Sequence, residues 1–176
     1  MSGSWRRLRS NVILSNQWLT VEKNAYLAGS EPIDDYFIIR RQPFVLVVPE
    51  TDEGVILVRQ YRPATERFYL SLPAGYIDPL EDVLAAAARE LLEETGVVGR
   101  NFRLVGSLDP LPGYLSSAAH IVKCSVLIGT VPVRHDDEVD EVIVVPWSEI
   151  EKLIGAGHID EMQAVAALLL VRLIGG

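Results

Sequence analysis

The sequence predicts a strand-rich α/β domain with about three helices. The chain has 176 residues, enough for one domain with a sizeable core. Hydrophobic residues make up 49 % of it and charged residues 23 %, which is typical of soluble globular proteins. Runs rich in β-branched and aromatic residues cluster on both sides of one strongly helical segment. The helices are too few, and the strand runs too clustered, for a doubly wound parallel sheet.

The expected strands are short runs with β-branched and aromatic side chains, separated by turn-forming residues. They fall at residues 12–27, 35–41, 44–50, 54–62, 102–110, 118–131 and 140–147. Residues 66–75 are expected to be extended, and they end in Pro and Gly.

Three segments predict helices. Residues 79–95 are the strongest of them, because they are rich in Ala, Leu and Glu and are followed by Gly96 as a C-terminal cap. Residues 148–157 predict a short helix with Ser148 as its N-cap. Residues 160–174 have an apolar face broad enough to pack on a sheet.

Charge and composition exclude several classes of protein. The net charge of −8 argues against a nucleic-acid binder, which needs a basic surface, but suits carboxylates that bind cations. The one cysteine, Cys124, allows no internal disulfide and is expected to be buried in a strand. The N-terminus lacks the apolar run of a signal peptide, and the apolar run near the C-terminus is too short to span a bilayer. We therefore expect a cytoplasmic protein that does not bind membranes.

An acidic cluster stands on the strongest predicted helix. Glu90 and Glu94 lie one turn apart, Glu93 lies beside them, and Arg89 precedes Glu93 by one turn. Crowded like charges are unfavourable unless something offsets them, and the hard cations Mg²⁺ and Mn²⁺ prefer such oxygen ligands. The competing interpretation is a solvated helix face, which is what acidic runs usually are.

The wider spacing favours the chemical interpretation. The pattern runs from Gly75 through Glu81 to Arg89-Glu90, then Glu93-Glu94 and Gly96, followed by Val97. Seven fixed identities at this spacing arise by chance about once in 10⁸ windows at ordinary residue frequencies. This segment resembles the signature box of the Nudix hydrolase family, with every fixed position filled.

The resemblance implies a fold, a domain layout and a reaction. The fold would be an α/β/α sandwich with a mixed β-sheet at residues 41–176, preceded by a short strand-rich region at 1–40 that relatives use for dimerisation. The reaction would be metal-dependent hydrolysis of a nucleoside diphosphate linked to another moiety, by water attack on phosphorus. A homodimer is part of the same expectation.

The resemblance also assigns roles within the box. Glu90, Glu93 and Glu94 would hold Mg²⁺ or Mn²⁺, together with the backbone carbonyl of Ala74 or of its neighbour Gly75. Arg89 and Glu81 would orient the acids. Gly75 and Gly96 would be positions where a side chain obstructs the backbone. The alanines of the helix would form its packing face.

Features outside the box resemble the ADP-ribose and nucleotide-sugar pyrophosphatase branch. The run leading through Arg62 suits a phosphate contact, because a guanidinium matches phosphate oxygens; the alternative is a surface arginine. Pro112 and Gly113 lie where the branch has a marker proline, although such a pair also forms plain turns. The pocket for base and ribose would include Tyr36, Phe37, Arg40 and Arg41, with core packing as the alternative for the two aromatics.

A general base would come from the late acidic loop. Glu138 matches the position of the catalytic glutamate in this branch, and Glu141 is the second choice; a solvated acidic hairpin is the alternative. The chain departs from the branch at Ser71, where relatives often carry Glu, and in having no acid shortly after Gly113. ADP-ribose, ADP-sugars, GDP-sugars and other nucleotide conjugates are therefore all candidate substrates.

Two other classes of protein compete with the hydrolase. A Nudix-like ligand sensor without catalysis predicts loss of the box carboxylates, yet Glu90, Glu93 and Glu94 are all present. A purely structural α/β protein leaves the crowded acids without a purpose.

Overall fold

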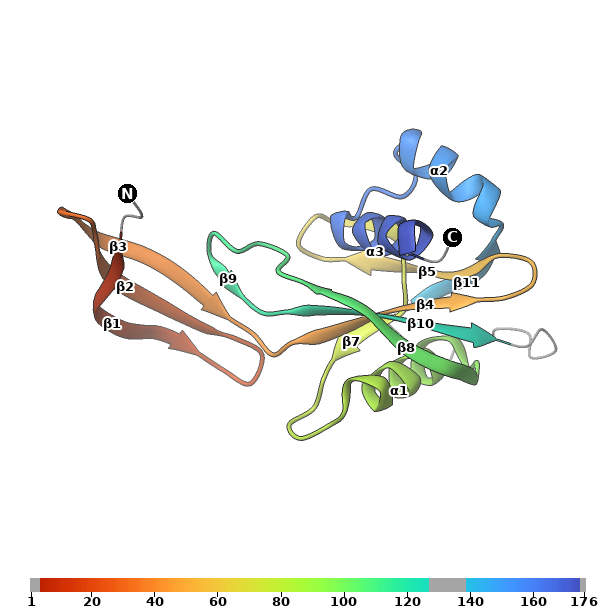
Figure 1. Ribbon diagram of the computed structural model, residues 1–176, viewed down its shortest axis with the longest axis horizontal. Coiled ribbons are helices and arrows are strands. Elements are labelled where there is room, and N and C mark those ends of the chain that lie inside the picture. The colour runs from red at the N-terminus through yellow and green to blue at the C-terminus, as the bar shows by residue number, and fades with distance from the viewer. Residues whose placement is uncertain (1–3, 127–138, 175–176) are drawn as a thin grey trace. The chain divides into compact units, whose positions relative to one another are not determined.

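The computed structural model describes residues 4–126 and 139–174. Contacts divide the chain into two compact units (Figure 1). The first consists of Met1–Pro43 with Asp109–Ala118, and the second of Phe44–Leu108 with Ala119–Gly176. The predicted boundary between an N-terminal region at residues 1–40 and a Nudix domain at residues 41–176 stays a prediction.

The first unit is a sheet with the strand order β1-β2-β3-β9. Strands β1 (Trp5–Ser15), β2 (Thr20–Ala28) and β3 (Glu31–Arg40) are antiparallel, and β9 (Leu115–Ser116) runs parallel to β3. The run 12–27 is divided between two strands because the Asn16 side chain accepts the backbone N–H groups of Trp18 and Leu19 and closes a turn.

The second unit contains a mixed sheet with the order β11-β5-β4-β10-β8. Its main strands are β4 (Phe44–Glu50), β5 (Val55–Arg62), β8 (Gly99–Leu108), β10 (Ala119–Val126) and β11 (Val139–Val145). Strand β10 runs parallel to β4 and antiparallel to β8. The short strands β6 (Arg67–Ser71) and β7 (Ala74–Tyr76) pair with β5 and β4. Each remaining expected strand overlaps an observed one.

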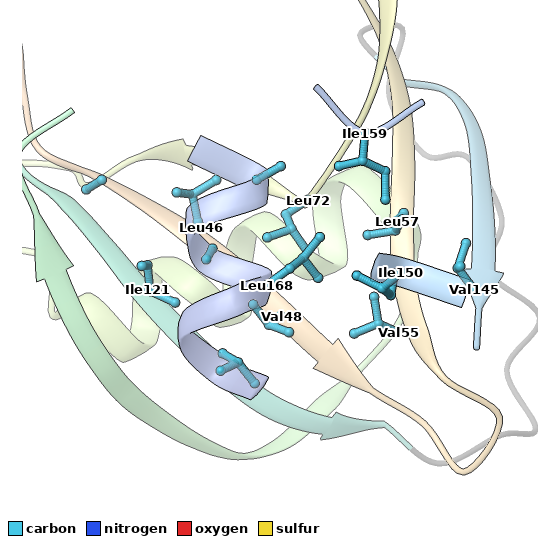
Figure 2. Close-up of a cluster of buried hydrophobic side chains, with 14 residues drawn as sticks. Leu46, Val48, Val55, Leu57, Leu72, Ile121, Val145, Ile150, Ile159 and Leu168 are labelled. Atoms are coloured by element: carbon cyan, nitrogen blue, oxygen red, sulfur yellow. The ribbon is translucent and has the colours of Figure 1, made fainter. Parts of the chain in front are cut away.

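Helices cover both faces of this sheet. Helix α1 (Val83–Thr95) packs on one face through a cluster that includes Leu91, Val47 and Val122. Helices α2 (Trp147–Gly155) and α3 (Met162–Ile174) pack on the other face, where Ile150 and Leu168 meet the sheet (Figure 2). The second unit is therefore an α/β/α sandwich with a mixed sheet, as expected.

The ends of α1 follow from capping. The Asp82 side chain accepts the backbone N–H groups of Leu84 and Ala85, so the helix begins at Val83 rather than near residue 79. Gly96 ends it with a left-handed φ of 67°, as expected. Two of the alanines, Ala86 and Ala87, are fully buried against the sheet. The alanine stem therefore packs closely and fixes the orientation of the acids beyond it.

The expected N-cap of α2 is wrong. The helix begins at Trp147, and its N-cap position is held by Pro146, which makes no side-chain capping bond. The Pro146 carbonyl accepts the Glu149 N–H at 2.9 Å, so Ser148 lies inside the first turn rather than at its N-cap. A proline with its fixed φ preorganises this start without a hydroxyl.

Cys124 lies in β10 with 2 % of its surface exposed, as expected. Burial, with a smaller contribution from Glu50, raises the pKa of the thiol to about 12. Within residues 4–126 and 139–174, every helix falls short of the length and apolarity that a membrane span requires.

Candidate active site

Three consecutive residues of β7 each meet a different side chain of α1. The Ala74 N–H donates to the Glu94 carboxylate at 3.3 Å. The Tyr76 carbonyl accepts Arg89 Nη2 at 2.9 Å. Between them, a Cβ placed on Gly75 would lie 2.1 Å from Glu90 Oε1. A side chain at position 75 would therefore displace the Glu90 carboxylate, which occupies that space.

Arg89 links the acids of the box. Its Nε and Nη2 donate to the two oxygens of Glu81 at 3.0 and 2.9 Å. Its Nη1 donates to Glu90 Oε1 at 2.6 Å and to Glu93 Oε2 at 3.1 Å. The hydrogen bond with Glu81 is the main cause of a raised pKa at Arg89, and the same bond lowers the pKa of Glu81. The guanidinium therefore contacts three carboxylates of the box, and its role in orienting them stays a prediction.

Glu90 is a nearly buried carboxylate with 9 % of its surface exposed. Its pKa is raised chiefly by removal from water, which outweighs the lowering effect of Arg89; the neighbouring charges of Glu93 and Glu81 raise it further. A buried carboxylate in this position is stabilised by a nearby cation, because the cation favours its charged form.

Glu94 and Glu93 have different surroundings. Glu94 is 4 % exposed and accepts Gln60 Nε2 at 3.0 Å, whereas the Glu93 side chain is 54 % exposed. The other amide atom, Gln60 Oε1, is buried without a hydrogen-bond partner among the described residues. Such an atom usually binds a water or an ion.

The chemistry of these groups fits a hard divalent cation. Carboxylate and carbonyl oxygens are the ligands that Mg²⁺ and Mn²⁺ prefer. In the described residues no three acidic, His or Cys side chains converge closely enough to hold one ion, since Arg89 binds Glu90 and Glu93 while Glu94 is directed toward Gln60 and Ala74. The donor types therefore match a metal site, with Arg89 engaging two of the carboxylates.

A cavity of about 900 Å³ lies in the first unit. Four of the predicted substrate-binding residues line it: Tyr36, Arg41, Pro112 and Gly113. The Tyr36 hydroxyl donates to the Gly113 carbonyl, which joins β3 to the turn before β9. The other lining residues are Trp5, Tyr26, Ile38, Pro43, Asp109, Tyr114, Leu115, Ser116, Ser117 and Ala118.

An aromatic cluster in this cavity was missed by the sequence analysis. The rings of Trp5, Tyr26 and Tyr36 meet edge to face, with centroids 5.5 to 6.1 Å apart. Trp5 lies in the N-terminal segment, for which the sequence analysis predicted no strand before residue 12. The available signal for a strand there was Trp5 itself and the β-branched run of Val12 and Ile13.

Two other predicted residues lie outside the cavity lining. Phe37 is exposed, and the Lys23 ammonium lies 5.8 Å from its ring centroid. Arg40 donates to both oxygens of Glu22, at 2.6 and 3.1 Å, and to Ser116 Oγ at 3.3 Å. The bond from Arg40 is the main cause of a lowered pKa at Glu22.

The remaining predicted residues lie on or near β5 and β11. Arg62 ends β5 and forms an ion pair with Glu161 at 3.6 Å. Glu141 is exposed and stands opposite Arg59 in the sheet register, whereas Gln60 points to the other face. Glu138 lies outside the described residues.

Comparisons with known proteins agree with this fold. The NUDIX domain family matches residues 40–167. The chain is 35 % identical to the "ADP compounds hydrolase NudE" of Escherichia coli (strain K12), over 73 % of this chain and 69 % of that protein. It is 36 % identical to the "ADP-sugar pyrophosphatase" of Mus musculus, over 79 % and 72 %.

A solved structure extends the match to almost the whole chain. The crystal structure of an ADP compounds hydrolase superposes with a TM-score of 0.78 at 28 % identity, covering 97 % of this chain and 93 % of that one. The chain therefore belongs to the Nudix family and is a Nudix hydrolase. Members of this family generally depend on divalent metal ions.

Proposed function

We propose that this Nudix hydrolase cleaves the pyrophosphate bond of a nucleoside diphosphate linked to a sugar, giving a nucleoside monophosphate and a sugar phosphate. The observation that carries the proposal is the complete box, whose Glu90, Arg89 and Glu94 each contact a successive residue of β7. The names of two relatives, the "ADP-ribose pyrophosphatase" of Bacillus subtilis (strain 168) and the mouse "ADP-sugar pyrophosphatase", support the same class of substrate.

The cofactor in this proposal is Mg²⁺, with Mn²⁺ as an acceptable substitute. Glu90, Glu93, Glu94 and the Ala74 carbonyl would hold it. A divalent ion there neutralises pyrophosphate charge and makes a bound water more acidic. The part of Arg89 is to keep two of the carboxylates oriented, which its bonds to Glu90 and Glu93 support.

The proposed general base is Glu138, with Glu141 as the second choice. The side chain of Glu141 shares a face with Arg59, and the contact between Gln60 and Glu94 is on the other face. Glu138 is therefore the first to test. Glu138→Gln should lower kcat while leaving the folded structure intact, and a normal rate in that variant would move the role to another group.

The nucleoside part of the substrate is proposed to bind in the cavity of the first unit. Its aromatic lining suits a planar base, and Arg41 suits a ribose hydroxyl or a phosphate. Phe37 and Arg40 remain predicted contacts beside it, and Arg62 a predicted phosphate contact. Tyr36→Ala should raise KM more than it lowers kcat, because the base is bound alike in ground and transition states.

A cytoplasmic homodimer completes the proposal. Every residue of β1 is exposed, including Trp5, Leu8, Val12 and Leu14, and such an apolar edge strand is normally covered. Light scattering on a size-exclusion column should give twice the mass of the chain. A monomer at micromolar concentration would contradict this part.

One experiment tests the function and selects the substrate. The protein is incubated with Mg²⁺ and, separately, ADP-ribose, an ADP-hexose, a GDP-hexose, a dinucleotide and a nucleoside triphosphate. We expect release of a nucleoside monophosphate from at least one of the nucleotide sugars. Binding of a nucleotide sugar without turnover would instead support the alternative, a Nudix-like sensor that lacks catalysis.

A further inference from the structure

We propose that Glu161, at the start of α3, is a positioning residue that holds the Arg62 guanidinium ready for a phosphate oxygen of the substrate. The inference rests on the proposed pyrophosphate hydrolysis. It adds to the residues that serve the reaction a carboxylate that lies outside the signature box, close to the C-terminus.

The Glu161 side chain points into the protein. Only 19 % of it is exposed, although it stands directly before α3 and its own carbonyl accepts the Val165 N–H at 3.0 Å. A carboxylate withdrawn from water needs charged or hydrogen-bonding partners. The partners of Glu161 therefore indicate what it is there to hold.

Its two partners come from the hairpin of β5 and β6. The Ser71 hydroxyl donates to Glu161 Oε2, and Arg62 Nη2 lies 3.6 Å from Glu161 Oε1. Ser71 itself is 1 % exposed, so its hydroxyl has little access to water. One oxygen of Glu161 is thus fixed by a buried hydroxyl, and the other is directed at Arg62.

The strand register places Arg62 on the same face of β5 as Gln60. Ser71 pairs with Val58, and Tyr69 pairs with Gln60, so Ser71, Gln60 and Arg62 share one face of the hairpin. From that face, Gln60 donates to the Glu94 carboxylate at 3.0 Å. Arg62 follows Gln60 by two residues on β5, so strand alternation puts it on the face from which Gln60 reaches Glu94.

The contact with Glu161 orients Arg62 without occupying all of its hydrogen-bond donors. A guanidinium carries five N–H donors in a planar fork, and the ion pair with Glu161 engages Nη2 from one side. The neighbouring pair differs: Arg67 contacts Asp160 at 2.7 Å and stacks 4.1 Å from the Tyr69 ring centroid. Asp160 and Glu161 thus attach the same helix start to the same hairpin, and only Glu161 does so through Arg62.

This pair of neighbours provides a matched experiment. Steady-state rates with ADP-ribose and Mg²⁺ are measured for Glu161→Gln, Arg62→Ala, the double variant, and the control Asp160→Asn. Circular dichroism and melting temperature are recorded for each. Glu161→Gln keeps the size of the side chain and an acceptor for Ser71, but it removes the charge that orients Arg62.

We expect Glu161→Gln to raise KM about tenfold, the size of one charge-assisted contact, with kcat changed little. Phosphate binding shared by ground and transition states has this signature. In the Arg62→Ala background, Glu161→Gln should add nothing, because its effect passes through Arg62. Asp160→Asn should leave KM and kcat at their wild-type values.

Three results would overturn the proposal: an unchanged KM in Glu161→Gln, additive effects in the double variant, or an equal rise in KM in Asp160→Asn. If Glu161→Gln does not fold, Glu161→Asp, which draws the carboxylate back from Arg62 by one methylene, must still raise KM, and that rise must disappear in the Arg62→Ala background. If the wild type does not hydrolyse ADP-ribose, the proposed function fails with that substrate. The same variants then test the inference through the Kd of ADP-ribose measured by calorimetry.

Discussion

The two units of the chain differ in what stabilises them. In the second unit, apolar side chains form two buried clusters on the two faces of the sheet. Among the described residues of the first unit, the buried apolar side chain is that of Ala25, and all eleven residues of β1 are exposed. The second unit therefore has a core of its own, and the first relies on strand pairing and edge-to-face aromatic contacts.

This difference separates two kinds of chemistry. Acids that must stay close together against their mutual repulsion belong on a rigid support, and α1 provides one through its buried alanines and Leu91. The proposed recognition of a base would need aromatic surface accessible to a ligand, and Trp5 and Tyr36 line a cavity that offers such a surface. Variants of either unit test whether the two roles are divided in this way.

The largest effect should come from a box carboxylate. Glu90→Gln should lower kcat by about 10³-fold, since metal-ion catalysis contributes several kcal/mol to transition-state stabilisation. Glu149→Gln, at a surface pair with Lys152, is the control and should keep the wild-type rate. Steady-state assays at saturating Mg²⁺ measure both. A near-normal rate for Glu90→Gln would remove it from the metal ligands.

Gly75→Ala should lower activity about 100-fold, because the new Cβ would displace the Glu90 carboxylate and misplacements of about 1 Å are that costly. The matched control is Gly155→Ala, where nothing lies within 4 Å of the added atom. Relative kcat/KM values measure the difference. Equal activity of the two variants would show that the position of the Glu90 carboxylate against β7 is not required for the reaction.

Core truncation should distinguish the units by stability. Leu91→Ala removes a fully buried side chain and should lower the free energy of unfolding by about 2–5 kcal/mol. Leu8→Ala removes a side chain that is 48 % exposed and should cost less than about 0.5 kcal/mol. Urea unfolding at low protein concentration compares them. A larger loss from Leu8→Ala would show that β1 is packed even in the monomer.

The smallest effect should come from the ion pair of the first unit. The pKa of Glu22 in the folded protein is lowered from its ordinary value of 4.5, mainly by the hydrogen bond from Arg40. The stabilisation from this pair is therefore complete at pH values above 4.5, and it is lost as the pH falls through the folded pKa. Glu22→Gln should therefore cost a few tenths of a kcal/mol at pH 7, because Arg40 is partly exposed. The cost should vanish in acid. The control is Glu31→Gln, at an exposed position. A difference in unfolding free energy between the two variants that does not change with pH would contradict the pairing of Glu22 with Arg40.

Much of the second unit was predictable because its signals are local. Gly96 had to end α1, and the spacing from Gly75 to Val97 marked the box without knowledge of the sheet. The Ser148 cap failed because Pro146 closes the first turn by backbone bonds alone. Local composition does not distinguish these two ways of starting a helix.

Long-range contacts were beyond the sequence. Nothing near Ser71 in the chain indicates Glu161, since the two are 90 residues apart and meet through the packing of α3. Trp5 and Tyr26 became neighbours of Tyr36 only when β1 and β3 flanked β2. Register and helix docking, rather than residue type, decided these parts of the candidate sites.

Hydrolysis of ADP-ribose in ¹⁸O-labelled water tests the central claim most directly. With Mg²⁺ present, the account predicts AMP and ribose phosphate in equal amounts, one ¹⁸O atom in one of the two products, and no reaction when a chelator replaces the metal. Turnover that is unaffected by the chelator, or the absence of ¹⁸O from both phosphates, would contradict water attack on phosphorus at a metal-dependent site on α1.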